Sequence, residues 1–161
     1  LVGSEMCIRD SFFVIGLRLR GFGPSKRNPD LTDEECTKAK MAMEKIERLW
    51  KKGKEFFFYG RFMDNIGLNT SNPDVLSKVY TSQNGVAIAI WNTTKKETTC
   101  DISVNLKTLS IADVNVTKVT SLSTDETIPH KRREDTLKTK IMIKAHDIDA
   151  IIIKIKKHNT F

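Results

Sequence analysis

The spacing of apolar side chains changes near residue 74, from a helical period before this point to a strand period after it. Residues 85–92 read Gly-Val-Ala-Ile-Ala-Ile-Trp-Asn, and this almost unbroken apolar run predicts a strand that is buried on both faces. The Asn84-Gly85 dipeptide at its start is a strong hairpin signal, because both residue types tolerate a positive φ. We therefore expect residues 75–80 and 86–92 to pair as an antiparallel hairpin.

The strand pattern continues after this hairpin. Cys100, Ile102 and Val104 alternate with polar residues, as in a strand that has one face towards water. Further strand signals follow at intervals of about 10–15 residues, in the ranges 114–122, 137–143 and 148–155. Together with the hairpin, these segments predict an antiparallel β-sandwich of Greek-key-like topology, with a partly closed barrel as the alternative.

A helix with a clear start is predicted before the strands. Thr32 is the candidate N-cap, and Glu35, three residues later, completes the pattern of a capping box. Gly53 and Gly60 are the two candidate ends of the helix. Residues 61–74 are interpreted as a connector. The helix has a single apolar stripe, which has to pack against another element, formed by Cys36, Ala39, Met43, Ile46 and Trp50.

The amino-terminal stretch contains two parts with different expectations. Residues 1–11 include Met-Cys-Ile-Arg-Asp-Ser, which resembles a translated sequencing adapter, and they are interpreted as a non-native extension. Residues 12–22 begin with aromatic and β-branched side chains, which predict a strand. The predicted organisation is therefore a non-native extension (1–11), a strand, helix and connector (12–73), and a β-sandwich (74–161).

Composition and charge narrow the classes of partner. The chain has 161 residues, of which 39% are hydrophobic and 29% charged, as is typical of a globular protein. Its net charge of +7 arises from 13 basic and 10 acidic side chains in residues 1–73 and from 14 and 10 in residues 74–161. Nucleic-acid binders usually concentrate basic charge on one face beside aromatic residues, so this even spread predicts no nucleic-acid partner. No apolar run reaches the roughly 18 residues that span a bilayer, and no membrane partner is expected.

Side chains that could carry metal, cofactor or hydrolytic chemistry are scattered along the sequence. The three cysteines form no C-x-x-C motif and the three histidines have no helical i,i+4 spacing, so no metal site is predicted. The sequence has no phosphate-binding loop, dinucleotide fingerprint or nucleophile elbow, and no cofactor is expected. Glycoside hydrolysis needs a pair of carboxyl groups. No two acids have a spacing that forces them together, so no catalytic residue is nominated.

Three residues are candidates for ligand binding. Trp91 could stack on a sugar ring, although a tryptophan at the end of a central strand more often belongs to the core. Tyr59 and Arg61 follow an aromatic run and are placed at the rim of a pocket, with a role in joining helix and sandwich as the alternative. The basic run 130–133 is expected in a hairpin loop. It could attract phosphate or an acidic glycan, and a solvated turn is the simpler interpretation.

The order of these parts resembles the carboxyl-terminal end of amylase-like and related glycoside hydrolases with a (β/α)8 barrel. Residues 46–60, Ile-Glu-Arg-Leu-Trp-Lys-Lys-Gly-Lys-Glu-Phe-Phe-Phe-Tyr-Gly, are similar to the last barrel helix of those families. Residues 79–92 are similar to the early hairpin of the sandwich that follows the barrel, and residues 147–154 to its last strand. The Tyr59-Gly60 junction and the Trp91-Asn92 strand end carry the most specific similarity.

The resemblance implies that residues 12–60 are the last βα unit of a truncated barrel. Barrel enzymes carry their acids on loops at the carboxyl ends of the strands, which here would lie upstream. The chain would then be the non-catalytic end of a carbohydrate-active enzyme, inactive alone, with a sandwich that packs on and stabilises the missing barrel. The alternative is a stand-alone β-sandwich module for carbohydrate binding or adhesion. A carbohydrate is the candidate ligand in either case.

Overall fold

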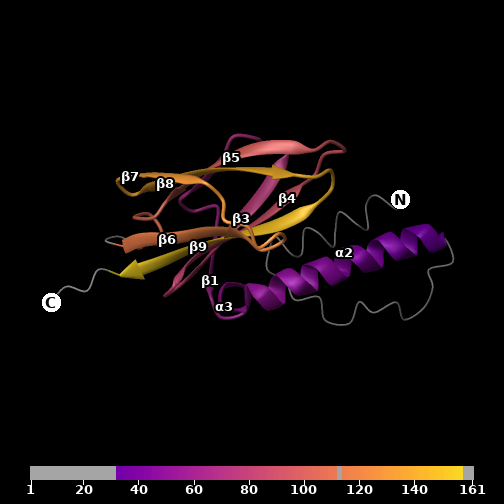
Figure 1. Ribbon diagram of the computed structural model, residues 1–161, viewed down its shortest axis with the longest axis horizontal. Helices are drawn as coiled ribbons and strands as arrows, with labels where there is room; N and C mark the ends of the chain where they lie inside the picture. Colours follow the sequence, from indigo (N-terminus) through magenta and orange to yellow (C-terminus); the bar gives the residue numbers. More distant parts are fainter. Residues whose placement is uncertain (1–31, 112–113, 158–161) are drawn as a thin grey trace.

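The computed structural model describes residues 32–157 except 112–113 and contains two antiparallel sheets that lie face to face (Figure 1). One sheet has five strands in the order β1-β3-β4-β9-β6, and the other has four in the order β2-β5-β8-β7. The described strands are β1 (Arg61–Asp64), β2 (Leu68–Thr70), β3 (Val75–Ser82), β4 (Gly85–Asn92), β5 (Thr98–Asn105), β6 (Val114–Ser121), β7 (His130–Arg133), β8 (Thr136–Ile143) and β9 (Ile148–Lys157). The predicted β-sandwich is therefore confirmed, whereas residues 1–11 and the predicted strand at 12–22 lie outside the described residues.

The topology places the last of these strands in the middle of the larger sheet. β9 pairs with β4 on one side and with β6 on the other. Apart from the hairpins β3–β4 and β7–β8, consecutive strands lie in different sheets, so the chain crosses repeatedly between the two layers. The inner faces of both sheets are held together by one apolar core, to which the two central strands of the larger sheet contribute Val86, Ile88, Ile90, Ile151 and Ile153.

The β3–β4 hairpin forms as predicted, and every residue of β4 is buried. Its turn consists of Gln83 and Asn84, one residue earlier than expected, because Gly85 already pairs with Ser82 as the first residue of β4. Gly85 has a φ of 151°, and a Cβ at this position would lie 2.0 Å from the carbonyl oxygen of Ile153. The glycine is thus needed for the close approach of β9 to β4.

The polar end of β4 also has a structural reason. Asn92 is fully buried, and its side-chain amide donates to the carbonyl oxygens of Lys96 at 2.8 Å and Lys144 at 2.9 Å. Its side-chain oxygen accepts hydrogen bonds from the backbone N–H and the hydroxyl of Thr94, at 3.0 and 2.8 Å. Buried amides stabilise a fold only when their donors and acceptors are paired, so Asn92 ties the β4–β5 and β8–β9 connections together.

The structure contains three strands that sequence patterns did not predict. β1 and β2 lie within the stretch 61–74, which was interpreted as a connector, and β7 replaces the hairpin loop expected at 130–133. All three are short edge strands, and β7 consists of four polar residues, so none shows the apolar alternation that marks a strand. In β6 a bulge between Val116 and Lys118 shifts the alternation, which explains why Val116 and Val119 are three residues apart.

The predicted helix is present in two pieces. α2 (Asp33–Lys52) begins directly after Thr32, as expected, and α3 (Lys54–Phe57) continues after a break at Gly53. A Cβ on Gly53 would lie 2.4 Å from a ring atom of Phe57, so the glycine makes room for this aromatic ring. The helical region then ends before Gly60. Of the two glycines predicted as ends, Gly53 interrupts the helical region, and Gly60 lies three residues beyond its last residue, Phe57.

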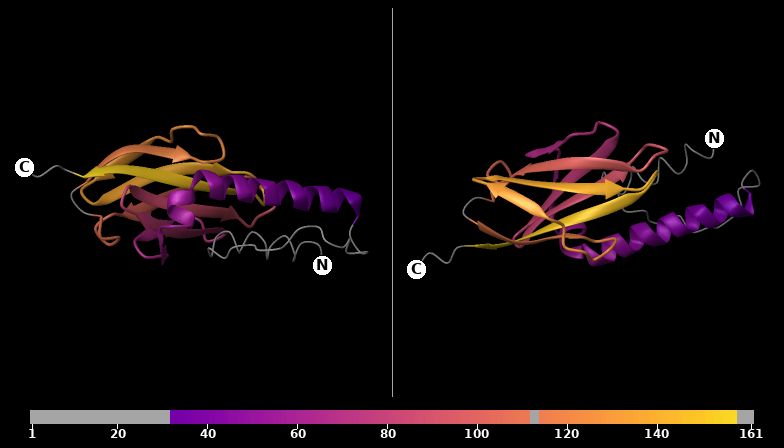
Figure 2. Two further views of the ribbon diagram at one scale, coloured as in Figure 1. Left: turned by 90° about the horizontal axis from the view of Figure 1, so that it is seen from below. Right: turned by 45° about the horizontal axis from the view of Figure 1, so that its top comes forward.

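The carboxyl-terminal part of this helical region covers the outer face of the five-stranded sheet. Ile46, Leu49 and Trp50 of α2 belong to a second buried cluster, together with residues on the outer faces of β4 and β9. Several of those sheet residues are small, including Ala89 and Ala150, which allows the helix and its aromatic side chains to approach the sheet closely. The amino-terminal turns of α2 extend past the end of the sandwich in Figures 1 and 2.

Candidate functional site

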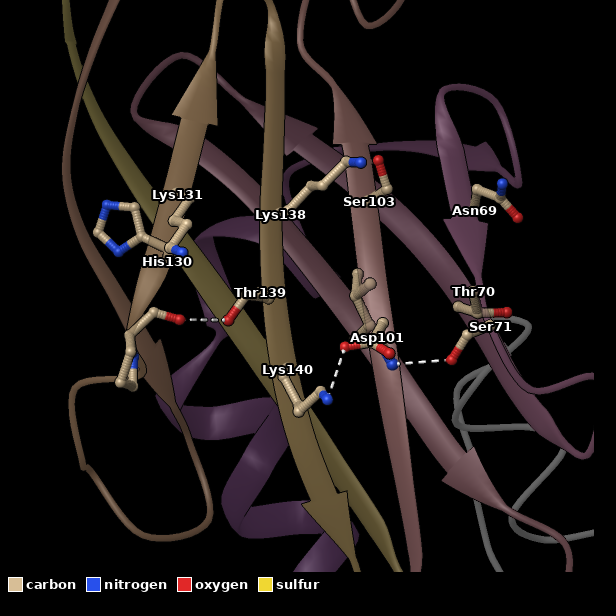
Figure 3. A pocket seen from close by; sticks show the side chains of 12 residues that line it. Asn69, Thr70, Ser71, Asp101, Ser103, His130, Lys131, Lys138, Thr139 and Lys140 are labelled. Atoms are coloured by element: carbon tan, nitrogen blue, oxygen red, sulfur yellow. Dashed lines mark hydrogen bonds and ion pairs between the residues drawn. The ribbon is translucent and has the colours of Figure 1, made fainter.

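The outer face of the four-stranded sheet carries no helix, and it is hollowed into a groove of about 590 Å³ (Figure 3). Residues of β2, β5, β7 and β8 all line the groove. Its volume falls within the range of about 300–1,000 Å³ that is typical of ligand sites. Charged side chains from β5, β7 and β8 line this groove, among them Asp101, Lys131 and Lys138.

One row of side chains runs across the whole groove. Strand register places Lys131 of β7 directly opposite Lys138 of β8, Lys138 opposite Ser103 of β5, and Ser103 opposite Asn69 of β2. Figure 3 shows the Lys138 side chain pointing from β8 towards Ser103. The row therefore begins with two ammonium groups and continues with a hydroxyl and an amide.

A second row, two residues further along the strands, is internally balanced. The Lys140 ammonium lies 3.3 Å from a carboxylate oxygen of Asp101, which is its cross-strand neighbour. The backbone N–H of Asp101 donates to the hydroxyl of Ser71 at 2.9 Å, and the N–H of Ser71 donates to the Asp101 carbonyl at 2.9 Å. Among the described residues, Asp101 is the only acid that lines the groove, and these residues do not place a pair of carboxyl groups there.

The two lysines of the first row have no such partner. Within the described residues, no carboxylate lies within 4 Å of the ammonium group of Lys131 or Lys138, and both side chains are exposed. No Trp, Tyr or Phe ring lines the groove among the described residues. Strand pairing thus places Lys131 and Lys138, seven residues apart in the sequence, in neighbouring positions on one sheet face.

The three residues nominated for binding lie elsewhere. Trp91 is 4% exposed and belongs to the cluster beneath the helix, where its indole N–H is buried without a hydrogen-bond partner. Tyr59 is 75% exposed just after α3, with the Lys54 ammonium 5.5 Å from its ring centroid. Arg61 is exposed at the start of β1. None of the three lines the groove, and their binding roles stay predictions.

Sequence reasoning identified part of the groove and missed the rest. The run 130–133 was interpreted as a solvated turn, with attraction of phosphate or an acidic glycan as the alternative, and Lys138, Ser103 and Asn69 were not connected with it. The available signal was the alternation of polar and apolar residues in β5 and β8, which assigns Ser103 and Lys138 to the outer faces. Without the register of three strand pairs, however, their place in one row could not be derived.

Other kinds of site were sought over the described residues. They contain no group of three or more His, Cys, Asp or Glu side chains arranged to hold a metal ion. None of the described helices has the length and apolar character of a membrane span. Cys100 is a free, fully buried residue of the sandwich core. The groove is therefore the candidate site.

No protein-family model and no curated protein matches the chain. Solved structures do match, among them AmyP in complex with maltose, with a TM-score of 0.50 and 13% identity over 81% of this chain and 23% of that protein. A noncanonic maltogenic α-amylase, AmyB from Thermotoga neapolitana, has a TM-score of 0.49 and 11% identity over 81% of this chain and 28% of its own. A putative α-N-acetylgalactosaminidase from Bacillus halodurans has a TM-score of 0.42 and 14% identity, with coverages of 76% and 26%.

These matches concern the fold. The chain spans between 23% and 28% of the length of the three proteins, and the TM-score reaches 0.50 only for AmyP. The match to AmyP agrees with the predicted β-sandwich at the level of the fold.

Proposed function

We propose that this chain is the carboxyl-terminal, non-catalytic part of a carbohydrate-active glycoside hydrolase, and that its β-sandwich packs on and stabilises a catalytic barrel. In this proposal α2 is the last barrel helix, and residues 12–60 form the last βα unit. The observation that carries the proposal is the contrast between the two ends of α2, one seated on the sandwich and the other extending beyond it (Figure 1).

The seated end of α2 is fully packed. Leu49 is 2% and Ile46 5% exposed, and the Lys45 ammonium pairs with the Asp147 carboxylate at 2.6 Å. Towards the projecting end of α2, side chains are less buried. Met41, one turn before the packed residues, is 63% exposed. Short helical turns are marginal in water without tertiary contacts, so the projecting turns of α2 need a further partner to be stable. A barrel on the far side of the helix supplies one.

The comparison with AmyP supports the same arrangement. AmyP shares the fold over 23% of its own length and was determined with maltose bound. More than three quarters of AmyP thus lies outside the shared part, which is room for a separate catalytic unit. The groove on the four-stranded sheet contains one carboxylate, Asp101, so the proposal assigns the catalytic pair to the barrel rather than to this chain.

The experiment is to recover the coding sequence upstream of Phe12 and to compare the extended protein with the present chain. We expect hydrolysis of starch or aryl glycosides only from the extended protein. Met41→Lys should lower the melting temperature of the extended protein and leave that of the present chain unchanged, because Met41 contacts the barrel only in the former. Met142→Lys, at an exposed position on the other sheet, is the matched control and should change neither. Glycoside hydrolysis by the present chain alone would contradict the proposal.

The alternative, a stand-alone module that binds carbohydrate or mediates adhesion, is favoured by one observation, the open groove in Figure 3. Neutral sugars are usually bound by stacking on an aromatic ring, and no Trp, Tyr or Phe lines the described groove. A glycan array probed with the full chain distinguishes the two functions. Binding of neutral oligosaccharides by this chain, with no activity in the extended protein, would favour the module.

A further inference from the structure

Two lysines of the groove lack an acidic partner. Lys131 and Lys138 are opposite each other in the register of β7 and β8, and the Lys138 side chain points away from Lys131, towards Ser103 (Figure 3). Their neighbour Lys140 has a carboxylate partner in Asp101, whereas no carboxylate pairs with the other two lysines among the described residues. An anionic ligand in the groove that reaches both ammonium groups would gain a charge-assisted hydrogen bond from each.

The rest of the row indicates what kind of anion fits. Ser103 and Asn69 continue the line from Lys138 and offer a hydroxyl and an amide, which both donate and accept hydrogen bonds. A ligand that matches the whole row therefore has an anionic end and, beside it, neutral hydroxyl groups. The groove volume of about 590 Å³ accommodates more than a single inorganic ion.

The groove also lacks the features that two competing ligand classes require. Single-stranded nucleic acids gain much of their affinity by stacking bases on aromatic rings, and no Trp, Tyr or Phe lines the described groove. Neutral sugars make little use of two unpaired ammonium groups. Both arguments leave saccharides that carry carboxylate or sulfate groups.

We propose that the groove on the outer face of the four-stranded sheet binds an acidic saccharide, with Lys131 and Lys138 contacting its carboxylate or sulfate group and Ser103 and Asn69 contacting its hydroxyls. The inference does not depend on the proposed role beside a barrel, because every residue in it lies on the sandwich. It adds a ligand-binding role to a domain whose other proposed role is to pack on a barrel.

The test is calorimetric titration of the full 161-residue chain with alginate and heparin tetrasaccharides, one carboxylated and one sulfated. Maltotetraose and an oligothymidylate of equal charge serve as comparison ligands. Lys131→Gln combined with Lys138→Gln removes the two ammonium groups. Lys95→Gln combined with Lys96→Gln makes the same change in net charge at two exposed lysines of the β4–β5 turn, outside the groove.

We expect at least one acidic tetrasaccharide to bind, and the groove double variant to weaken its affinity by about tenfold or more, as for the loss of two charged contacts. The turn double variant should change the affinity by less than about threefold, since only diffuse attraction is lost. A preference for alginate or for heparin identifies the anionic group. The proposal is overturned if neither saccharide binds, if both double variants weaken binding equally, or if the oligothymidylate or maltotetraose binds as tightly as the acidic saccharides.

Discussion

The two sheets of the sandwich share one core and differ in what their outer faces carry. The five-stranded sheet presents Ala89, Ala150 and Trp91, and the helical region covers them. The four-stranded sheet presents Lys131 and Lys138 in an open groove. Alternation along a strand shows which residues face the core. Whether the outer face packs against a helix or meets solvent and ligands depends on whether the outward-facing residues are apolar or charged.

The largest expected effect tests whether the helix is part of the folded unit. Leu49→Ala removes a side chain of α2 that is 2% exposed and packs against the sheet, and it should lower the free energy of unfolding by about 2–5 kcal/mol. Met142→Ala, at a 69% exposed position on the outer face of β8, should change it by less than about 0.5 kcal/mol. Urea denaturation measures both. Equal costs for the two variants would mean that the two outer faces are alike.

Larger side chains should also be tolerated differently on the outer faces of the two sheets. Ala89→Val should destabilise the protein by about 1–3 kcal/mol, because Ala89 is fully buried under the helix and the added methyl groups have no free space. Thr99→Ile on β5, whose side chain is exposed on the open sheet, should remain within about 0.5 kcal/mol of the parent. Thermal unfolding followed by circular dichroism compares the pair. A tolerated Ala89→Val would show that the helix is loosely seated.

Alkaline pH is expected to weaken the covered sheet. Burial raises the pKa of the Tyr80 phenol well above its ordinary value, so its proton is held more tightly in the folded than in the unfolded state. The corresponding stability is fully present below the unfolded pKa of about 10 and declines above it, by at most about 1.4 kcal/mol per pH unit. Tyr80→Phe keeps the ring packing and should flatten this decline. Urea midpoints measured from pH 9 to 11.5 check it, and identical slopes in parent and variant would rule out Tyr80 as the cause.

The smallest effects concern the open sheet. Lys138→Glu replaces a like-charge pair with an opposite-charge pair across from Lys131 and should raise the free energy of unfolding by about 0.2–1 kcal/mol. Lys140→Glu should lower it by a similar amount, because it removes the partner of Asp101 and places two carboxylates opposite each other. Both changes should shrink at high salt, where exposed charges are screened. Changes of the same sign for the two variants would contradict the pairing described here.

Most of the sandwich follows from patterns that are local in the sequence. The alternation in β5 and β8, the apolar run of β4 and the helix start after Thr32 are each set by neighbours within a few residues. The edge strands β1, β2 and β7 were not predictable in this way, because they are short, and the one core residue of β1 (Met63) and the one of β2 (Leu68) give no alternating pattern. The hairpin turn lies one residue earlier than expected because Gly85 pairs with Ser82, and the need for a glycine there comes from a distant residue, Ile153.

The groove was harder to predict from the sequence than the strands. Its four-residue row combines side chains between residues 69 and 138, and each join depends on the register of a different strand pair. A count of charges along the chain averages over both faces of every strand, so it found an even distribution where the folded sheet has a basic row. Trp91 shows the converse: its strand-end position allowed either a core or a binding role, and the structure places it beneath the helix.

The position of β9 has a consequence for biosynthesis. Because this strand lies between β4 and β6, the larger sheet cannot close until residues 148–157 have left the ribosome. Until then the nascent polypeptide holds the apolar strand β4 with one neighbour missing, a condition that favours aggregation and chaperone binding. Folding of the larger sheet is therefore expected to wait for the synthesis of β9.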